Sequence, residues 1–170
     1  MEKDKNILGI SYSTRLIGLA IVSSNHLVDY SIKLYKEKWS PAKCDKIKQA
    51  LQSCVEDYNI QEIVLSIPAQ FSQIPAFGEI NECINSFARD KGIPVSYQNR
   101  KMIMTLCLEK EKKNKQGYMR SLVFFFPELA RYYEKERRNR KRYYVKVFEA
   151  IGFALLQSKV DKLRKQQGKG

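Results

Sequence analysis

The sequence has few of the residues that histidine, disulfide or membrane chemistry requires. It contains one histidine, His26, in the stretch SSNH, which argues against a histidine-based metal or acid–base site. The four cysteines, Cys44, Cys54, Cys83 and Cys107, have neither zinc-site nor redox-pair spacing, so we expect buried, reduced thiols and a cytoplasmic protein. The N-terminus MEKDKNILG does not resemble a signal peptide, and no apolar run approaches the roughly 18 residues of a membrane span. No membrane partner is therefore expected.

Acidic residues are scarce in the second half of the chain. The formal net charge of the 170 residues is +13, from 31 Lys and Arg against 18 Asp and Glu. Residues 1–99 carry 11 of each sign, so residues 100–170, with 20 basic and 7 acidic side chains, carry the whole excess. Such a basic half favours a polyanionic partner, and nucleic acid is the leading candidate. An anionic membrane surface is the weaker alternative, because the sequence has no lipidation signal.

Hydrophobic periodicity divides the chain into short strands followed by helices. Alternation and β-rich composition predict the first three strands, and Ser40-Pro41 has the residue types of a helix start. The nearly all-apolar stretch EIVLSIP is typical of a strand buried on both faces. The predicted elements are strands 6–12, 15–23 and 26–36, helix 41–57, strand 62–68, a helix from 77 to about 92, strand 93–98, helical segments 100–111 and 117–126, a charged helix or loop 127–142, and a helix 143–165.

This order of elements predicts a single α/β domain over residues 1–170, with a frayed basic tail at 160–170. Three antiparallel strands are followed by two parallel strands in strand–helix–strand units, which gives a mixed five-stranded sheet flanked by helices. The pattern matches the ribonuclease H-like fold.

Three stretches resemble the RuvC-type and YqgF-type resolvase-like proteins. The opening SYSTRLIGLA (residues 11–20) is similar to the YqgF-type opening D-Y-G-T-R-R-I-G-L-A and to the RuvC-type D-P-G-T-x-x-x-G. The segment IPVSYQNR (93–100) resembles the YqgF-type L-P-V-x-x-x-D-E-R, and VFEAIGFALL (147–156) resembles the alanine-rich last helix of the RuvC type. These landmarks fit residues 6–157.

The resemblance implies phosphodiester cleavage by two divalent metal ions held among carboxylates. Mg²⁺ prefers hard anionic oxygens in octahedral geometry. Two such ions about 3.5–4 Å apart repel each other unless several negative charges surround them. Hydroxyl and amide groups do not supply that charge, so the residues at the matching positions decide whether the chemistry survives.

The strand positions that carry acids in these families are neutral here. Ser11 stands where the first strand has its aspartate, and Ser66 stands where the RuvC type has a glutamate at the end of its fourth strand. Gln98 and Asn99 replace the acids of the D-E-R segment, while Arg100 matches its arginine. These are degenerate active-site positions.

The last helix keeps one carboxylate. Glu149 falls on one RuvC-type acidic position and is catalytic only if the protein is active, while Lys146 falls on the other. A shift of the alignment by one residue would place Phe148 there and leave nothing acidic. We therefore expect no resident metal or other cofactor, with Mg²⁺ only under an alternative in which other acids rebuild the site. Those acids are Asp29, Glu62 and Glu79.

Hydroxyl and basic side chains form a candidate nucleic-acid surface. Lys and Arg neutralise phosphates and release counterions, and hydroxyls donate to phosphate oxygens, although Ser and Thr also stabilise turns locally. The candidates are Ser13, Thr14, Arg15, Arg100, Lys112, Lys113, Lys115, Arg137, Arg138, Arg140, Lys141 and Arg142. Tyrosines among them either stack on unpaired bases or are half-buried helix residues; they are Tyr132, Tyr133, Tyr143 and Tyr144.

The sequence thus favours a nucleic-acid-binding protein of ribonuclease H-like fold without nuclease activity. One alternative is a Mg²⁺-dependent nuclease, resembling a Holliday-junction resolvase, with a relocated acidic site. Another is a protein-interaction module, and a homodimer is compatible with any of the three. The sequence does not distinguish DNA from RNA.

Overall fold

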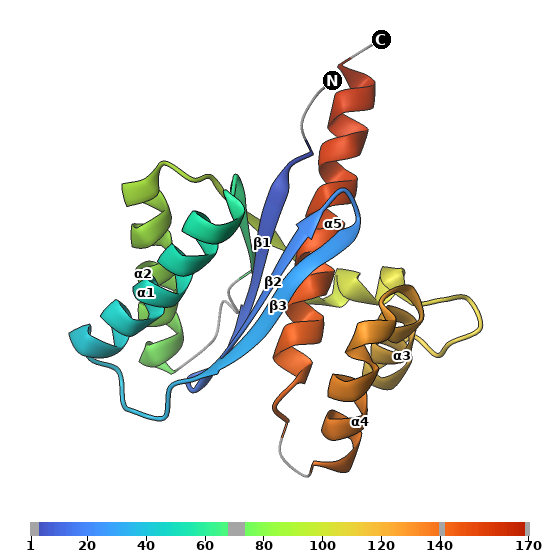
Figure 1. Cartoon of the computed structure of the whole chain (residues 1–170), viewed down its shortest axis with the longest axis horizontal. Coiled ribbons are helices and arrows are strands. Elements are labelled where there is room, and N and C mark those ends of the chain that lie inside the picture. The colour runs from blue at the N-terminus through green and yellow to red at the C-terminus, as the bar shows by residue number, and fades with distance from the viewer. Residues whose placement is uncertain (1–3, 68–73, 140–141, 169–170) are drawn as a thin grey trace.

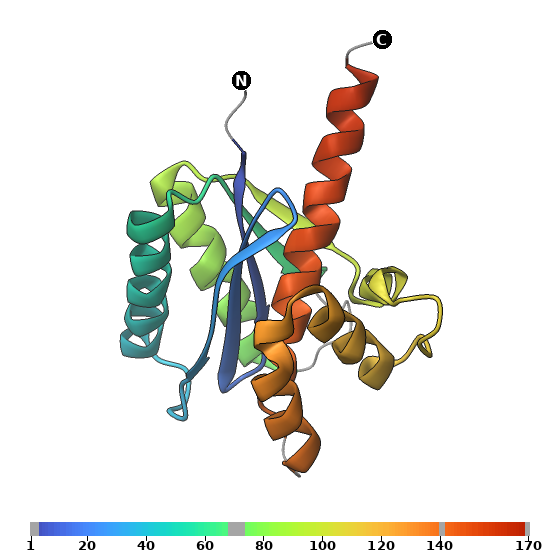
Figure 2. The same ribbon diagram turned by 45° about the vertical axis from the view of Figure 1, so that its right-hand side comes forward.

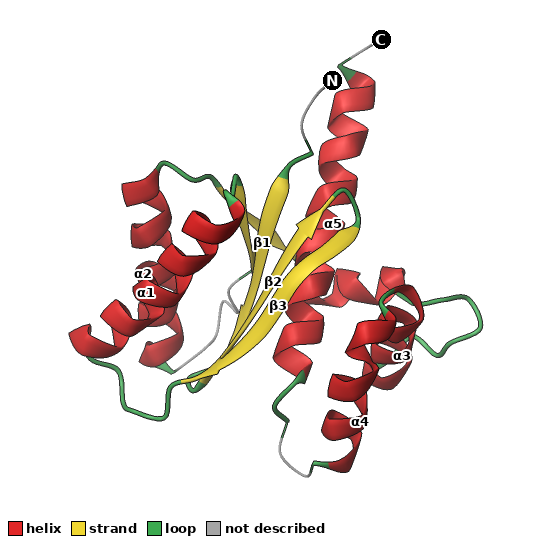
Figure 3. Ribbon diagram, in the orientation of Figure 1, coloured by secondary structure: helices red, strands yellow, loops and turns green. Residues whose placement is uncertain are grey.

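The computed structural model describes residues 4–67, 74–139 and 142–168. A five-stranded sheet of order β3-β2-β1-β4-β5 lies between two layers of helices (Figures 1 and 3). Its strands are β1 (Asn6–Tyr12), β2 (Leu16–Ser23), β3 (His26–Leu34), β4 (Glu62–Ser66) and β5 (Val95–Gln98). The helices are α1 (Pro41–Tyr58), α2 (Pro75–Lys91), α3 (Lys115–Phe125), α4 (Ala130–Arg138) and α5 (Val145–Gln167), with 3-10 turns η1 (Arg100–Leu106) and η2 (Pro127–Leu129).

The first three strands form an antiparallel meander, and β4 and β5 run parallel to β1. The β2–β3 hairpin turns at Ser24 and Asn25, whose φ angles of +47° and +66° suit a two-residue turn between twisted strands. Ser40 caps α1 by accepting a hydrogen bond from Lys43 N at 3.1 Å, and Pro41 follows as its first residue. The predicted ribonuclease H-like arrangement of strands is confirmed.

Helices cover both faces of the sheet, so alternate residues of each strand enter two separate cores. α1 and α2 pack on the face that carries Leu8 and Ile10, while α5 packs on the face that carries Ile7 and Val64. Figure 2 shows α5 lying alone across its face of the sheet, with α3 and α4 beside its N-terminal half. The apolar N-terminal turns of α5 are buried as the sequence predicts, and this burial fixes which side chains α5 turns toward the sheet.

Two glycines bring the backbone of α5 directly onto the sheet. A Cβ at Gly9 in β1 would lie 2.0 Å from the carbonyl oxygen of Ala150, and a Cβ at Gly18 in β2 would lie 2.3 Å from the backbone of Lys146. Any larger residue would push the helix away from the strands. Gly9 and Gly18 therefore set the depth at which α5 sits, and with it the position of every side chain near Lys146.

The structure corrects several predicted boundaries. The helical segment 100–111 is a 3-10 turn that ends at Leu106, because Cys107 has extended backbone angles. Gly117 does not separate two helices but lies inside α3, which begins at Lys115 because Asn114 caps it. Strands 62–68 and 93–98 are shorter, as β4 and β5 show, and Pro68 lies outside the described residues.

The remaining differences concern the basic half and the thiols. Segment 127–142 forms η2 and α4, and α5 remains helical to Gln167; fraying of the tail 160–170 stays a prediction, and residues 169–170 are not described. The four thiols are free, but only Cys83 is fully buried, because Cys44 and Cys54 of α1 and Cys107 after η1 are half-buried at the edges of the two cores. The expectation that all four are buried is wrong.

Candidate nucleic-acid interface

The degenerate active-site positions converge at the carboxyl end of the parallel strands. β1 pairs with β4 in the register Gly9↔Val64, and the same offset carried two residues further sets Ser66 level with Ser11. Ser66 in turn pairs with Gln98 of β5. These three residues have the same strand parity as Gly9, which contacts α5, so their side chains lie on the α5 face of the sheet. The structure therefore brings Ser11, Ser66 and Gln98 together in one row.

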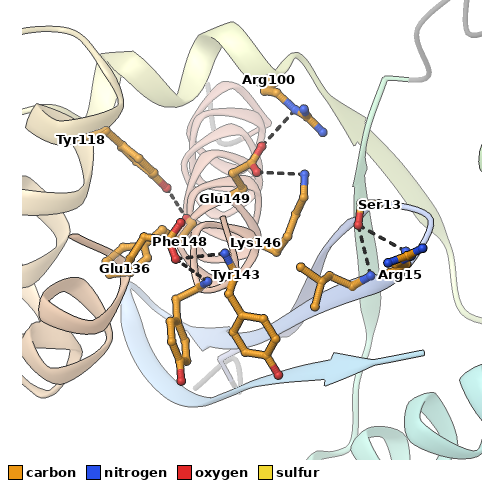
Figure 4. Close-up of polar contacts among 11 residues, drawn as sticks. Ser13, Arg15, Arg100, Tyr118, Glu136, Tyr143, Lys146, Phe148 and Glu149 are labelled. Atoms are coloured by element: carbon orange, nitrogen blue, oxygen red, sulfur yellow. Dashed lines mark hydrogen bonds and ion pairs between the residues drawn. The ribbon is translucent and has the colours of Figure 1, made fainter. Parts of the chain in front are cut away.

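Glu149 of α5 faces this end of the sheet and is held by two cations. Its side chain is about 7% exposed, and its two oxygens lie 3.0 Å from Arg100 Nε and 3.2 Å from Lys146 Nζ. Figure 4 shows Arg100 and Lys146 each directed at one oxygen of the carboxylate. Lys146 is itself 14% exposed, whereas Arg100, at the start of η1, is 53% exposed and faces solvent as well. The single retained carboxylate is thus neutralised by the protein's own cations.

Lys115 lies within electrostatic range of Glu149, and Arg142 lies within electrostatic range of Lys115. Burial lowers the pKa of Lys115 at the start of α3, and the charges of Arg142, Lys146 and Arg100 lower this pKa further, while Glu149 opposes the shift. Four cations and one carboxylate therefore lie close together, with two of the cations paired directly to Glu149. Because the cations outnumber it, the cluster keeps a net positive charge and favours the approach of an anion. We call Arg100, Lys115, Arg142, Lys146 and Glu149 the cationic cluster.

Two buried side chains hold α3 and α4 against α5 and so position this cluster. Tyr118, fully buried in α3, donates its hydroxyl hydrogen bond to the backbone oxygen of Phe148, one residue before Glu149. Glu136 of α4 accepts hydrogen bonds from the backbone N–H groups of Tyr143 (3.0 Å) and Tyr144 (2.7 Å), where α5 begins. A carboxylate at this end of a helix satisfies free amides and complements the helix dipole.

The side chains at this site do not provide the ligands that a pair of divalent metal ions requires. Ser11 stands where the resembled families have an aspartate. Its Oγ is fully buried and has no hydrogen-bond partner among the described residues, so no neighbouring group supplies the negative charge that the aspartate would carry. Gln98 donates to Gln157 Oε1 at 2.8 Å instead of facing the carboxylate. Residues 4–67, 74–139 and 142–168 contain no group of three His, Cys, Asp or Glu side chains that could hold a metal. Because Glu149 is already paired with Arg100 and Lys146, the local net charge is positive and repels Mg²⁺.

The other acids that the sequence offered lie elsewhere. Asp29 accepts a hydrogen bond from the hydroxyl of Tyr58 at 2.7 Å, between β3 and α1. Glu62 pairs with Lys5 at 3.0 Å, at the amino end of β4 and so at the opposite end of the sheet. Glu79 lines a hollow between α1 and α2. These carboxylates do not converge with Glu149.

The turn between β1 and β2 is organised by its own side chains. Ser13 Oγ accepts hydrogen bonds from the backbone N–H groups of Leu16 (3.1 Å) and Arg15 (3.4 Å), which is the local turn-forming role (Figure 4). Lys43 of α1 is buried and donates to three backbone oxygens, those of Thr14 (2.7 Å), Tyr35 (3.2 Å) and Glu37 (2.8 Å). Burial lowers the pKa of Lys43. This ammonium fixes the turn and leaves Arg15 exposed at its tip.

The other basic candidates lie on the surface of the α3–α4 region. Lys112 and Lys113 are exposed between η1 and α3, and Arg138 is exposed at the end of α4. Arg137 forms an exposed ion pair with Glu134 at 3.2 Å. Arg140 and Lys141 lie outside the described residues. Asn99 caps η1 by accepting a hydrogen bond from Lys101 N at 2.9 Å, which gives it a local structural role.

The candidate tyrosines mostly contact each other. The ring centroids of Tyr132 and Tyr144 are 4.6 Å apart, and those of Tyr143 and Tyr144 are 4.8 Å apart. Tyr30 of β3 adds an edge contact to Tyr132 at 5.4 Å. These half-buried rings join α4 to α5 and β3, whereas Tyr133 lines a separate surface hollow.

Sequence reasoning missed Lys43, Tyr118 and Glu136, each of which acts through a contact outside its own helix. A signal existed for one of them, since Glu136 is an acid inside the run RYYEKERRNRKRYY. Gly9 and Gly18 also carried a signal, because glycine inside a strand often marks the close approach of another backbone.

Comparisons with known proteins support this description of the fold. No protein-family model and no curated protein matches the sequence. Among solved structures, Thermus thermophilus RuvC in complex with a Holliday junction substrate matches with a TM-score of 0.68 at 12% identity, over 94% of this chain and 96% of that one. Fowlpox virus resolvase in complex with Holliday junction DNA matches with a TM-score of 0.54 at 10% identity, over 91% and 97%.

A second Thermus thermophilus RuvC structure matches with a TM-score of 0.62 at 12% identity, over 88% of this chain and 90% of that one. In the described part of the chain, no helix is both long and apolar enough to cross a bilayer. Identities this low establish architecture and not activity. The protein has the ribonuclease H-like fold of the RuvC-type resolvases.

Proposed function

We propose that this protein binds nucleic acid through the cationic cluster and does not cleave it. The observation that carries the proposal is the pairing of Glu149 with Arg100 and Lys146, with Lys115 and Arg142 close by. A phosphate group is the anion that Lys and Arg side chains in this arrangement bind best. The sheet end that serves a metal centre in the resembled families is thereby used for direct contacts between cations and phosphates.

The charge distribution of the chain supports the same function. The whole excess of +13 lies in residues 100–170, which supply all five residues of the cationic cluster. Exposed Lys112, Lys113 and Arg138 extend the positive surface along the α3–α4 region. Binding through such a surface releases condensed counterions, so affinity should fall steeply as salt rises. The resolvases of similar fold occur in complexes with junction DNA, which makes branched DNA a suitable first probe.

The test is a binding titration with fluorescently labelled four-way junction, duplex and single-stranded oligonucleotides over a range of salt concentrations. The wild-type protein should bind at low salt without divalent ions, and the logarithm of its affinity should fall linearly with the logarithm of the salt concentration. A double substitution, Arg142→Glu with Lys115→Glu, should weaken binding to every probe. Absence of binding by folded wild-type protein at low salt would refute the proposal.

A matched control separates local charge from total charge. Exposed Lys91, at the end of α2, and exposed Lys162, next to Asp161 of α5, lie at the opposite end of the sheet, so Lys91→Glu with Lys162→Glu changes the net charge equally. This variant should retain most of the affinity. Incubation of each probe with Mg²⁺ or Mn²⁺ should leave it intact. Cleavage that Glu149→Gln abolishes would instead support the nuclease alternative.

A further inference from the structure

A surface hollow on α3 has the composition of a site for an unpaired base. It has a volume of about 310 Å³ and lies between α3, the loop that precedes it and α4. Phe124 and Tyr133 supply aromatic walls, and Lys110 and Arg120 supply cations. This volume is at the lower end of the range found for small-ligand pockets.

Phe124 is the most unusual residue of the hollow because it is large, apolar and 62% exposed. Its ring belongs to neither core and has an edge contact with the ring of Phe125, so most of its surface is available to a partner. The ammonium of Lys110 lies 5.4 Å from the ring centroid, which keeps a positive charge beside the ring face. An exposed aromatic ring with a flanking cation matches the platforms on which proteins stack single-stranded bases.

The polar groups of the hollow suit the edge of a base and its phosphate. Arg120 is held in place by Glu111, whose Oε2 lies 3.0 Å from Arg120 Nε and 2.9 Å from its terminal nitrogen. The hydroxyl of Tyr133 donates to Gln116 Oε1 at 3.4 Å. The hollow thus offers both donors and acceptors around an aromatic wall, and a base, with its flat face and polar edges, can use both.

The hollow and the cationic cluster lie at the two ends of one helix. Lys115 begins α3 and Phe124 is nine residues further along it, which corresponds to about 14 Å at 1.5 Å per residue. A strand of a few nucleotides can span this length. We propose that a phosphate of the bound strand contacts the cationic cluster while an unpaired base of the same strand stacks on Phe124. This inference rests on the proposed function and adds a preference for unpaired nucleotides.

The test compares Phe124→Ala with Phe125→Ala. Phe125 is the matched control because it is adjacent and 52% exposed, but it lines a different hollow. Its ring meets that of Phe124 edge-on at a centroid distance of 5.6 Å, so this control also measures the effect of removing a ring contact of Phe124. Probes are fluorescein-labelled single strands of DNA and RNA, the matching duplexes, and single strands in which abasic sites replace the bases. Removing one stacked base contact should weaken single-strand binding about five- to 150-fold, since such contacts contribute about 1–3 kcal/mol. Duplex binding and binding by Phe125→Ala should stay within about twofold of wild type.

The abasic strands provide a readout that a general loss of structure would not give. Without bases to stack, Phe124→Ala and wild type should bind the abasic strand equally, and the penalty should return when the bases do. Equal affinities of Phe124→Ala and wild type for the normal single strand would overturn the inference while leaving the proposed function intact. Failure of the wild-type protein to bind any probe would refute the proposed function itself.

Discussion

Neutralising Glu149 gives opposite effects on stability and on binding, and so tests the role of the cationic cluster. The Glu149→Gln substitution keeps the size of the side chain and removes its charge. It leaves the ammonium of Lys146, only 14% exposed, without its counter-ion 3.2 Å away. Arg100 also loses its partner, but Arg100 is half exposed and turns to water at little cost.

The expected loss of stability follows from this difference in burial. Removing one partner of a fully buried pair costs about 3–5 kcal/mol, and exposed pairs contribute about 0–1 kcal/mol. Since the glutamine oxygen still accepts one hydrogen bond, we expect a loss of about 2–3 kcal/mol. For a chain of this size that lowers Tm by about 5–10 °C. Nucleic-acid affinity should rise about two- to threefold at low salt, because one negative charge near the phosphate is removed.

Thermal melts followed by circular dichroism, and fluorescence anisotropy well below Tm, measure the two effects on one preparation. A double-mutant cycle with Lys146→Met isolates the pair, and its coupling energy should exceed about 1 kcal/mol. An unchanged Tm together with zero coupling would show that the ion pair contributes nothing. A several-fold loss of affinity in folded Glu149→Gln would show that the carboxylate itself contacts the ligand and would refute the repulsion expected between it and a phosphate.

Three other predictions concern the fold that carries the cluster. Gly18→Ala should destabilise the protein by about 1–3 kcal/mol in urea unfolding because its Cβ meets the α5 backbone, whereas Gly78→Ala, with open space in α2, should stabilise it by about 1 kcal/mol. Lys43→Met should cost about 2–3 kcal/mol in the same assay, because three backbone oxygens lose a charged donor. The hydrogen bond to Asp29 raises the pKa of Tyr58 to about 12 from the ordinary 10.0, so this stabilisation is complete below pH 10.0 and is lost as pH rises toward about 12. Tyr58→Phe should remove that part of the alkaline slope in unfolding titrations, and an unchanged slope would contradict it.

The sheet was predictable because its signals are local. Alternation in β3, the apolar run of β4 and the Ser40-Pro41 start of α1 each depend on neighbouring residues, and all three are found as expected. The start of α3 differs from the prediction for an equally local reason, which is the cap at Asn114. Asn114 Oδ1 accepts a hydrogen bond from Gly117 N at 2.9 Å, so the glycine belongs to the first turn of the helix.

The site was predictable only along single elements. The spacing of Lys146 and Glu149 indicated one helical face, and the hydrogen bond between them agrees with it. The approach of Arg100 and Lys115 depends on how η1 and α3 pack against α5, which local periodicity does not encode. The buried hydroxyl of Tyr118, which fixes that packing, looked like any other aromatic residue of a helix.

The contact of Glu136 with the start of α5 has a consequence for how a ligand can bind. Amides at the beginning of a long helix are a common receptor for phosphate. Here a side chain from α4 already occupies the N–H groups of Tyr143 and Tyr144, much as a bound anion would. An incoming phosphodiester must therefore rely on lysine and arginine tips, so recognition should tolerate variation in backbone geometry and depend strongly on ionic strength.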